Sequence, residues 1–470
     1  MSARSVRINL LCSWGAHGVA LLIGVVLMPF VLGVLGDATY GTWIFINAIA
    51  GYSGLMYLGF GEATGRYVAR HHERGEWEHL NRVVTGVLAV YLVMGAAVVL
   101  LAGLLAWLAP HLHDWDGRSI TEIRGVILIL GVTVAIGMIG SVFGGVLIGI
   151  QRFDLERGLT MLAGLVRLAL TLAFLSSTRP LLTLAVIYLI ITIIENGGHM
   201  LAAFTQARQL SPRPRHFCLK TLRECTGFSL FALVDDAARQ LIHATDSIVI
   251  GVVLGAQAIV PYFIAHRLCQ FLGAPVLHVA RVFMPRAGQL HAAAEAEPLR
   301  RLAARGVGLA FLLMAGCLIG AAFFGDELIR VWVGGGYGES HRVLIVLLTA
   351  ATAAVPMMVL RGALFAMGRV RVPALIYLLE AVTNLVLTLV LIGPLGLLGV
   401  ALGTAVPLLV CELGLLLPYA ARSLQMSCSR LLIAAVLPQL SALPALLAYS
   451  AVVSAWLPAP ESWFALAAVA

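Results

Sequence analysis

The chain has 470 residues, of which 60% are hydrophobic and 11% are charged, and its formal net charge is +8. Soluble domains carry roughly 25% charged residues, so this composition excludes an ordinary soluble enzyme and indicates a membrane protein. The positive charge lies on alternate loops between apolar stretches, where it reports topology. Nucleic acid is therefore not an expected partner.

Thirteen stretches are apolar and long enough to cross a bilayer, which takes about 20 residues as a helix. Two sets of six are separated by a basic segment, and one stretch follows them. The predicted spans, in chain order, are 8–35, 39–60, 83–109, 123–150, 158–177, 181–206, 226–253, 259–285, 305–325, 341–367, 372–393, 396–421 and 431–457. We predict an N-terminal lobe (1–207), a cytoplasmic linker (208–225), a C-terminal lobe (226–421), and a thirteenth span with the start of a fourteenth (422–470).

The two halves also match in sequence. Laying Gly145–Leu175 over Gly362–Ile392 places Arg152 on Arg369, and Val34–Gly36 overlies Val253–Gly255 near the start of each half. Internal duplication of a polytopic membrane protein is typical of secondary transporters. The predicted fold class is all-α: two six-helix lobes related as parallel repeats, with one or two additional C-terminal helices.

Orientation follows from the basic residues. Of 31 Lys and Arg, 21 fall on one set of alternate loops and 5 on the other. The richer set includes the segments Arg208–Arg223 and Arg286–Arg305 and the N-terminus. Because basic loops remain in the cytoplasm, we predict a cytoplasmic N-terminus.

Motifs for chemistry are absent from the sequence. The seven cysteines match neither a zinc site nor a redox pair. No nucleophile–base constellation, Walker loop or paired catalytic carboxylates appear. We therefore expect no enzymatic activity, no metal and no cofactor.

Ionisable residues inside the spans are the main functional indication. On the seventh span a polar set falls within an arc of about 140°, and on the eighth a second set falls within about 80°, since each helical residue advances by 100°. Arg167 lies near the middle of the fifth span, and Glu380 and Asn384 share a face of the eleventh. The two sets are Asp235, Asp236, Arg239, Gln240, His243, Asp246 and Ser247, and Arg267, Gln270, His278 and Arg281.

Charges at this depth face a cavity or a partner, because exposing them to lipid costs several kcal/mol. Arg167, Arg267 and Arg281 have no acid three or four residues away, so either another helix or an anionic ligand neutralises them. An i,i+4 pair such as Asp235 with Arg239 is as consistent with a static lock as with transport. Asp246 has no such cation, so it either binds a proton or sodium or bonds to a neighbouring helix.

Several short motifs resemble a known family. They resemble the polysaccharide-exporter branch of the multidrug/oligosaccharidyl-lipid/polysaccharide exporter superfamily, the O-antigen type oligosaccharide flippases. The resemblance extends over residues 1 to about 421 and implies two six-helix lobes around a central cavity that opens alternately to either side. The matching motifs are Pro29–Gly36, Tyr40–Trp43, Tyr57–Gly61, Arg66–Ala69, Thr245–Gly251 and Pro261–Tyr262.

The resemblance implies a substrate, an oligosaccharide on a polyprenyl diphosphate, and a location in the bacterial inner membrane. All five cations within the spans are arginines, whose planar fork suits a diphosphate better than lysine does. We predict substrate binding, with membrane lipid as a further partner, and coupling to H+ or Na+. The predicted substrate-binding residues are Arg167, Arg239, Arg267, Arg281 and His243; the predicted coupling residues are Asp235, Asp246 and Glu380.

Two other functions are weighed against this hypothesis. A cation-coupled multidrug exporter of the same superfamily is expected to use acidic residues, often in the first span, whose interior has none here. A membrane-embedded glycan ligase or polymerase is expected to carry a large loop with catalytic residues. The outside loops near Pro110–Glu122 and Asp326–His341 are too short for that. A scaffold in cell-envelope assembly does not account for the polar faces.

Overall fold

The computed structural model describes residues 3–57, 60–112, 115, 119–176 and 178–456, and every regular element in them is a helix. The chain forms two compact units, Met1–Gln240 and Leu241–Ala470. The division falls inside α7 (Leu219–Val253). The linker at 208–225 thus remains a proposed boundary.

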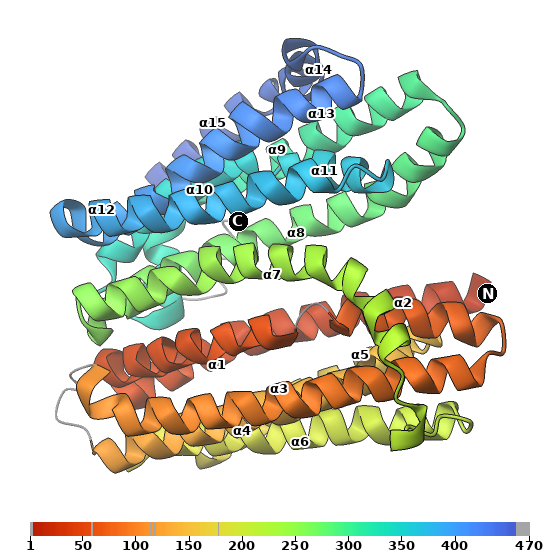
Figure 1. Cartoon of the computed structure of the whole chain (residues 1–470). Coiled ribbons are helices and arrows are strands. Elements are labelled where there is room, and N and C mark those ends of the chain that lie inside the picture. The colour runs from red at the N-terminus through yellow and green to blue at the C-terminus, as the bar shows by residue number, and fades with distance from the viewer. Residues whose placement is uncertain (1–2, 58–59, 113–114, 116–118, 177, 457–470) are drawn as a thin grey trace. The chain divides into compact units, whose positions relative to one another are not determined.

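The N-terminal unit is a bundle of long helices. Figure 1 shows α3, α4 and α6 running side by side, in agreement with their contacts. Long helices are the expected form because a backbone in lipid must satisfy its own hydrogen bonds. The elements are α1 (Ala3–Tyr52), the 3₁₀ turn η1 (Ser53–Tyr57), α2 (Phe60–Glu73), α3 (Trp77–Leu112), α4 (Ile120–Gly149), α5 (Phe153–Phe174), α6 (Pro180–Gln206), the 3₁₀ turn η2 (Pro214–His216) and the first part of α7.

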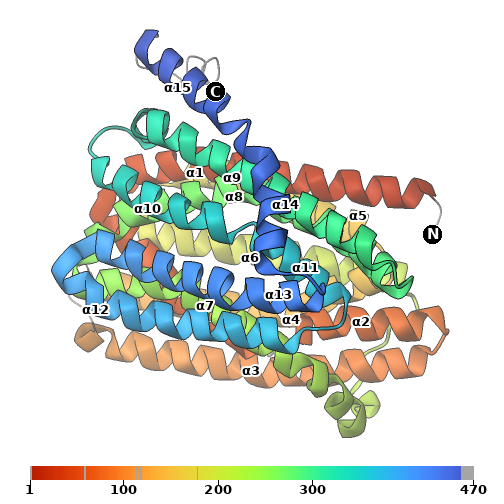
Figure 2. The same ribbon diagram turned by 90° about the horizontal axis from the view of Figure 1, so that it is seen from above.

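The C-terminal unit repeats this architecture and adds two helices. Of these, α14 crosses and packs on α9 (Figure 2). The elements after α7 are the 3₁₀ turn η3 (Ala256–Ala258), α8 (Ile259–Ala292), α9 (Ala296–Val333), α10 (Gly338–Ala354), α11 (Met357–Ala366), α12 (Arg371–Leu409), the π-helical segment Val410–Leu416, α13 (Leu417–Ser423), α14 (Cys428–Leu440) and α15 (Leu443–Trp456).

Each predicted span coincides with helix in the described residues, but several boundaries differ. The second span was predicted to end at residue 60, whereas a further helix, α2, extends from Phe60 to Glu73. The eleventh and twelfth spans correspond to the two parts of α12, which is broken at Gly396 by a positive φ of 58°, where the prediction separates them. By length and composition, eight helices of the described chain are able to cross a membrane, or nine if the bent pair α10–α11 is one span. The predicted start of a fourteenth span, Ser462–Ala470, lies outside the described residues.

The internal duplication extends to backbone conformation. The turns after α4 and α11 have the same hydrogen bonds: Arg152 N–H to Leu147 O at 2.8 Å, and Arg369 N–H to Leu364 O at 2.9 Å. The sequence alignment of the two halves superposes both the donors and the acceptors. The residue before each arginine has a positive φ, 62° at Gln151 and 74° at its counterpart glycine.

A second pair of turns confirms the repeat. Gly36 breaks α1 with φ 69° and ψ 167°, and its counterpart in the second half, Gly255, has φ 90° and ψ 163°. Left-handed φ values favour glycine, which has no Cβ. The equivalence of the two halves is therefore a property of the fold as well as of the sequence.

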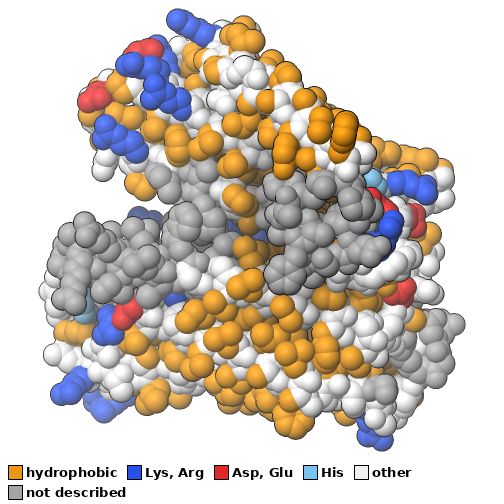
Figure 3. Space-filling view, turned by 180° about the vertical axis from the view of Figure 1, so that it is seen from behind, with side chains coloured by type: hydrophobic (Ala, Val, Ile, Leu, Met, Phe, Trp, Pro, Cys, Tyr) orange, Lys and Arg blue, Asp and Glu red, His pale blue; other side chains and the backbone are white. Residues whose placement is uncertain are grey.

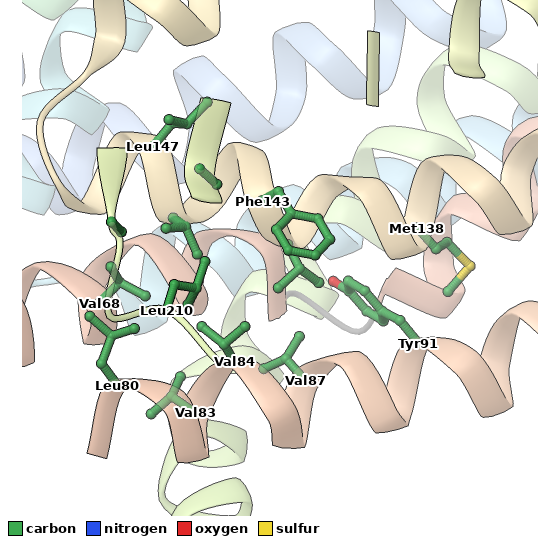
Figure 4. Packing of buried hydrophobic residues seen from close by; sticks show 14 of the residues in the cluster. Val68, Leu80, Val83, Val84, Val87, Tyr91, Met138, Phe143, Leu147 and Leu210 are labelled. Carbon is green, nitrogen blue, oxygen red and sulfur yellow. The ribbon is translucent and has the colours of Figure 1, made fainter. Parts of the chain in front are cut away.

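The core of the N-terminal unit joins α2, α3 and α4. Val68, Leu80 and Val84 are fully buried, and Tyr91 donates a hydrogen bond from its hydroxyl to Tyr57 O at 2.9 Å (Figure 4). In a bilayer such packing, and not hydrophobic transfer, holds helices together, because lipid is as apolar as leucine. The buried cluster also includes Ala203 of α6, so it joins four helices of this unit.

The outer surface suits lipid. Hydrophobic side chains cover wide areas in Figure 3, and charged ones gather at the margins. Leu100 and Trp107 of α3 are 75% and 68% exposed, and Val390 of α12 is 62% exposed. A water-soluble protein rarely exposes so continuous an apolar surface. The protein is a multi-pass membrane protein.

The two parts of α12 fold back on each other and pack closely. A Cβ added at Gly403 would lie 2.3 Å from Thr388 Oγ1, and one added at Gly399 would lie 2.1 Å from Leu391 O. Small residues allow helix backbones to approach in this way. This close approach brings the polar residues of the two parts of α12 within hydrogen-bond distance.

Candidate functional site

A buried carboxyl at the centre of the C-terminal unit joins three helices. Asp246 of α7 is 2% exposed. Its Oδ2 accepts hydrogen bonds from the Tyr262 hydroxyl of α8 at 2.5 Å and from Thr404 Oγ1 of α12 at 2.9 Å. The partner on α12 is 158 residues away in sequence, so no local pattern indicates it.

The first part of α12 adds oxygen atoms to this cluster. Asn384, 1% exposed, donates from Nδ2 to Thr404 Oγ1 at 3.0 Å. Thr388, one turn further, lies beside Asp246 without hydrogen-bond geometry. Asp246 Oδ1, Asn384 Oδ1 and Thr388 Oγ1 are all buried and have no hydrogen-bond partner. Unpartnered buried oxygens are costly, and they are the atoms that hold a proton or a hard cation.

The five intramembrane arginines fall into different environments. Arg361 of α11 forms an ion pair with Glu412 of the π-helical segment, and their side chains are 17% and 5% exposed. It also donates from Nη1 to Pro373 O at 3.3 Å and lies 4.9 Å from the Tyr377 ring centroid. Arg361 is therefore locked between helices, and its acid lies 51 residues away, beyond any local rule.

Arg167 of α5 is different. Its Nε is buried and has no hydrogen-bond partner, and its guanidinium lies 5.7 Å from the ring centroid of Tyr188 on α6. Tyr188 packs edge-on against Trp43 with ring centroids 5.3 Å apart. Within the described residues Arg167 forms no ion pair.

Arg267 of α8 is likewise not paired with an acid among the described residues. Its side chain is exposed, its guanidinium lies 5.0 Å from the Phe263 ring centroid, and Nη1 donates to Gln270 Oε1 at 3.2 Å. Gln270 in turn donates to Nε2 of His266 at 2.9 Å, and the His266 ring stacks on Tyr262 with centroids 6.0 Å apart. A continuous series of contacts along α8 thus joins Arg267 to the Asp246 cluster.

The remaining predicted residues are placed as follows. Arg239 of α7 is exposed and belongs to the N-terminal unit. Glu380 of α12 is 4% exposed and lies on the same face as Asn384, as predicted. The side chains of Asp235, His243 and Arg281 lie outside the described part of the chain. Sequence reasoning missed Tyr262 and Thr404 as hydrogen-bond partners of Asp246. It also missed Thr388 as a neighbour of Asp246, although Thr388 lies eight residues after Glu380 and four after Asn384, on the same face of α12.

Comparison with known proteins agrees with this architecture. Residues 7–291 match the family "Polysaccharide biosynthesis protein", and residues 232–390 match the MatE family. Since the first match covers more than half of the 470 residues, the chain belongs to the polysaccharide biosynthesis protein family. That family lies within the multidrug/oligosaccharidyl-lipid/polysaccharide exporter superfamily.

Individual relatives are distant but cover most of the chain. A Shigella flexneri protein named "Putative O-antigen transporter" is 21% identical over 407 residues, covering 84% of this chain and 93% of that protein. The "Uncharacterized membrane protein EpsK" of Bacillus subtilis is 21% identical over 415 residues, covering 86% and 80%.

Solved structures share the fold. The lipid II flippase MurJ in an inward closed conformation has a TM-score of 0.73 at 16% identity, covering 98% of this chain and 96% of its own. An inward-facing multidrug resistance transporter of the MATE family has a TM-score of 0.71 at 15% identity, covering 86% and 94%. At these identities the likeness establishes the transporter fold and not the substrate.

Proposed function

We propose that the protein flips a polyprenyl-diphosphate-linked oligosaccharide from the inner to the outer leaflet of the bacterial cytoplasmic membrane, by alternating access coupled to an ion gradient. Membership of the polysaccharide biosynthesis protein family supports this proposal. The names of two similar proteins, an O-antigen transporter and a lipid II flippase, point to lipid-linked saccharides as the substrate class.

The observation that carries the proposal is the contrast among the arginines. Arg361 is neutralised by Glu412, whereas Arg167 and Arg267 have no acid among the described residues. A cation held in a membrane protein without an acid favours an anionic ligand. A diphosphate accepts the bidentate hydrogen bonds that guanidinium offers. In the proposed cycle Arg167 and Arg267 each contact the diphosphate, as do Arg239, Arg281 and His243.

Coupling is assigned to Asp246. Its three-helix hydrogen bonds and the unpartnered oxygens around it suit a site that alternately holds and releases H+ or Na+. The contacts from Tyr262 through His266 and Gln270 to Arg267 provide a physical route between ion binding and substrate binding. Glu380 and Asp235 are proposed to contribute to the same coupling.

The test compares two arginines that have no acidic partner among the described residues with one that forms an ion pair. Arg167→Ala and Arg267→Ala should keep folded yield yet lose flipping of a lipid-linked oligosaccharide in proteoliposomes, and the Lys variants should recover part of it. Arg361→Ala serves as the matched control. It should lose folded protein, because breaking a buried pair costs about 3–5 kcal/mol. Unchanged flipping in both Arg167→Ala and Arg267→Ala would refute the diphosphate contacts.

A second candidate function is a cation-coupled multidrug exporter. The match of residues 232–390 to the MatE family and the buried acids of this region favour it. Mass spectrometry of lipid extracted from the purified protein separates the two functions. Polyprenyl diphosphate saccharides retained by the native protein and lost from Arg267→Ala support flipping. Flipping is rejected if no such lipid is retained and a cationic drug is transported.

A further inference from the structure

Three intramembrane arginines each lie against an aromatic ring, at a distance typical of a cation–π interaction, which is at most about 6 Å. The first pair joins α5 to α6, the second lies along α8, and the third joins α11 to α12. Each pair lies within one of the two units. The pairs, with the distance from the guanidinium carbon to the ring centroid, are Arg167 with Tyr188 at 5.7 Å, Arg267 with Phe263 at 5.0 Å and Arg361 with Tyr377 at 4.9 Å.

The three guanidiniums differ in their other partners. Arg361 donates a hydrogen bond to the carboxylate of Glu412, so an acid neutralises its charge. Arg267 donates to the neutral amide oxygen of Gln270, and the Nε of Arg167 is buried without a partner. Among the described residues neither Arg167 nor Arg267 has a carboxylate partner. For these two arginines an aromatic ring is present where Arg361 has both a ring and an acid.

A ring and a carboxylate stabilise an arginine in different ways. The ring attracts the cation to its negative face and leaves the N–H groups at the edge of the guanidinium unbonded. A carboxylate cancels the charge and accepts hydrogen bonds from those N–H groups. The planar, weakly hydrated guanidinium is well suited to stacking on a ring. A ring therefore preserves both charge and donors for an anionic ligand, whereas an acid would compete with that ligand.

The Tyr188 ring is itself supported by a third helix. It packs edge-on against the ring of Trp43 on α1, with centroids 5.3 Å apart and planes inclined by 72°. Trp43 is only 6% exposed, so its ring is fixed by packing on several sides. Trp43, Tyr188 and Arg167 thus form a continuous stack across α1, α6 and α5. This stack limits the positions that the Arg167 guanidinium can take.

Arg267 is held by two neutral groups of its own helix. Phe263 precedes it by four residues on α8, and side chains at this spacing lie on the same face. Gln270 follows it by three residues, and its Oε1 accepts a hydrogen bond from Arg267 Nη1 at 3.2 Å. The ring lies against the guanidinium and the amide occupies one donor. The remaining donors of Arg267 are left for a ligand.

We propose that Tyr188 and Phe263 are positioning residues for the anionic ligand of Arg167 and Arg267. Each ring keeps its guanidinium charged and oriented while the N–H donors stay available to phosphate oxygens. Neither ring needs to touch the ligand. The inference rests on the proposed function, which makes that ligand a polyprenyl diphosphate. Tyr377 has no such role, because the arginine that it contacts is already neutralised.

The test measures binding of undecaprenyl diphosphate to the purified protein, with undecaprenol as the neutral comparison lipid. Tyr188→Leu and Phe263→Leu should each bind the diphosphate about 3- to 30-fold more weakly, and undecaprenol with unchanged affinity. Tyr188→Phe and Phe263→Tyr keep a ring, so their affinity should stay within about 3-fold of the native protein. Tyr377→Leu is the matched control. It removes a ring from an arginine that has an acid, so diphosphate binding should not change.

A second measurement detects the stacking without any ligand. In protein with isotope-labelled arginine, the NMR signal of the Arg167 Nε–H group is assigned by its loss in Arg167→Lys. An aromatic ring shifts the resonances of protons beside it. Tyr188→Leu should therefore move this signal, whereas Tyr188→Phe should leave it near its native position. A signal that Tyr188→Leu does not move would overturn the stack.

The outcomes separate this inference from the proposed function. Unchanged diphosphate binding in both Tyr188→Leu and Phe263→Leu would refute the positioning role and leave the flippase function intact. A native protein that does not prefer the diphosphate to undecaprenol would count against the proposed function and this inference together, although the NMR signal would still report the stack. Equal weakening in Tyr377→Leu would also refute the positioning role. Because the two rings lie on different helices, misfolding of one variant leaves the other decisive.

Discussion

The Tyr262 hydroxyl donates a hydrogen bond of 2.5 Å to Oδ2 of Asp246, joining α8 to α7 inside the C-terminal unit. Thr404 donates to the same oxygen from α12, so one carboxylate oxygen holds three helices. The other oxygen, Oδ1, is buried without a partner. Asp246 therefore has one structural side and one side available for a ligand.

Asp246→Asn tests whether the carboxyl of Asp246, with its unpartnered Oδ1, binds a proton or a cation. Asparagine keeps the size and still accepts hydrogen bonds from Tyr262 and Thr404, so folded yield should stay near that of the native protein. It cannot exchange a proton and binds a cation weakly, so flipping in proteoliposomes should no longer respond to an imposed H+ or Na+ gradient. Gradient-driven flipping at the native rate in this variant would make Asp246 structural only.

Tyr262→Phe tests how much the hydrogen bond from Tyr262 to Asp246 Oδ2 stabilises the protein. It removes one hydrogen bond between transmembrane helices, and such bonds average about 0.6 kcal/mol. Thermal unfolding in detergent should show that the free energy of unfolding falls by about 1 kcal/mol. Transport should also be slower, because the contact between residue 262 and His266 is altered. Thr404→Val, which removes the second donor to the same oxygen, is the comparison. A stability loss of about 3 kcal/mol or more in Tyr262→Phe would indicate a larger rearrangement than this bond explains.

Gln270→Glu should weaken substrate binding, because the new carboxylate takes the position proposed for the substrate diphosphate beside Arg267. Gln270 Oε1 lies 3.2 Å from Arg267 Nη1, so a carboxylate at that position would pair with the arginine and compete with the diphosphate. We expect an affinity loss on the order of 10-fold for the lipid-linked substrate. The same helix offers a matched control in Gln289→Glu, because Gln289 Oε1 also lies 3.2 Å from an arginine, Arg286 Nη1. Equal losses in both variants would mean that the effect is general to α8.

The paired turns after α4 and α11 predict opposite responses to substitution. Gly368 has φ 74°, and Gly368→Val should destabilise the protein by about 1–3 kcal/mol, since β-branched residues are strained there. Its counterpart Gln151 has φ 62°, so Gln151→Gly relieves strain at the cost of chain entropy and should be neutral or stabilising by up to about 1 kcal/mol. Thermal unfolding of the two variants checks both signs; stabilisation by Gly368→Val would contradict the shared turn.

Cysteine labelling tests the proposed orientation. In a variant whose seven native cysteines are serine, Ser211→Cys should resist a membrane-impermeant thiol reagent applied to intact cells. Gly335→Cys, in the exposed turn between α9 and α10, should react and serves as the control. The reverse pattern would place the N-terminus outside and invert the proposed direction of transport.

Local sequence patterns were sufficient for the helices and the duplication. Apolar runs of about 20 residues have few alternatives to a helix in lipid. The repeat was visible because equivalent turns need equivalent backbone conformations, as at Gly36 and Gly255. The shared face of Glu380 and Asn384 follows from their i,i+4 spacing alone. The separation of the eleventh and twelfth spans was also predicted from the apolar pattern, and α12 breaks there, at Gly396.

The partners of the charged residues depended on tertiary structure. An i±4 rule covers one helix, whereas Arg361 finds Glu412 from 51 residues away and Asp246 finds Thr404 from 158 residues away. The sequence identifies Arg167, Arg267 and Arg361 as intramembrane cations but does not show which acid, if any, each one pairs with. Folding pairs Arg361 with an acid and leaves Arg167 and Arg267 without one among the described residues, because helix packing alone determines which side chains meet across an interface.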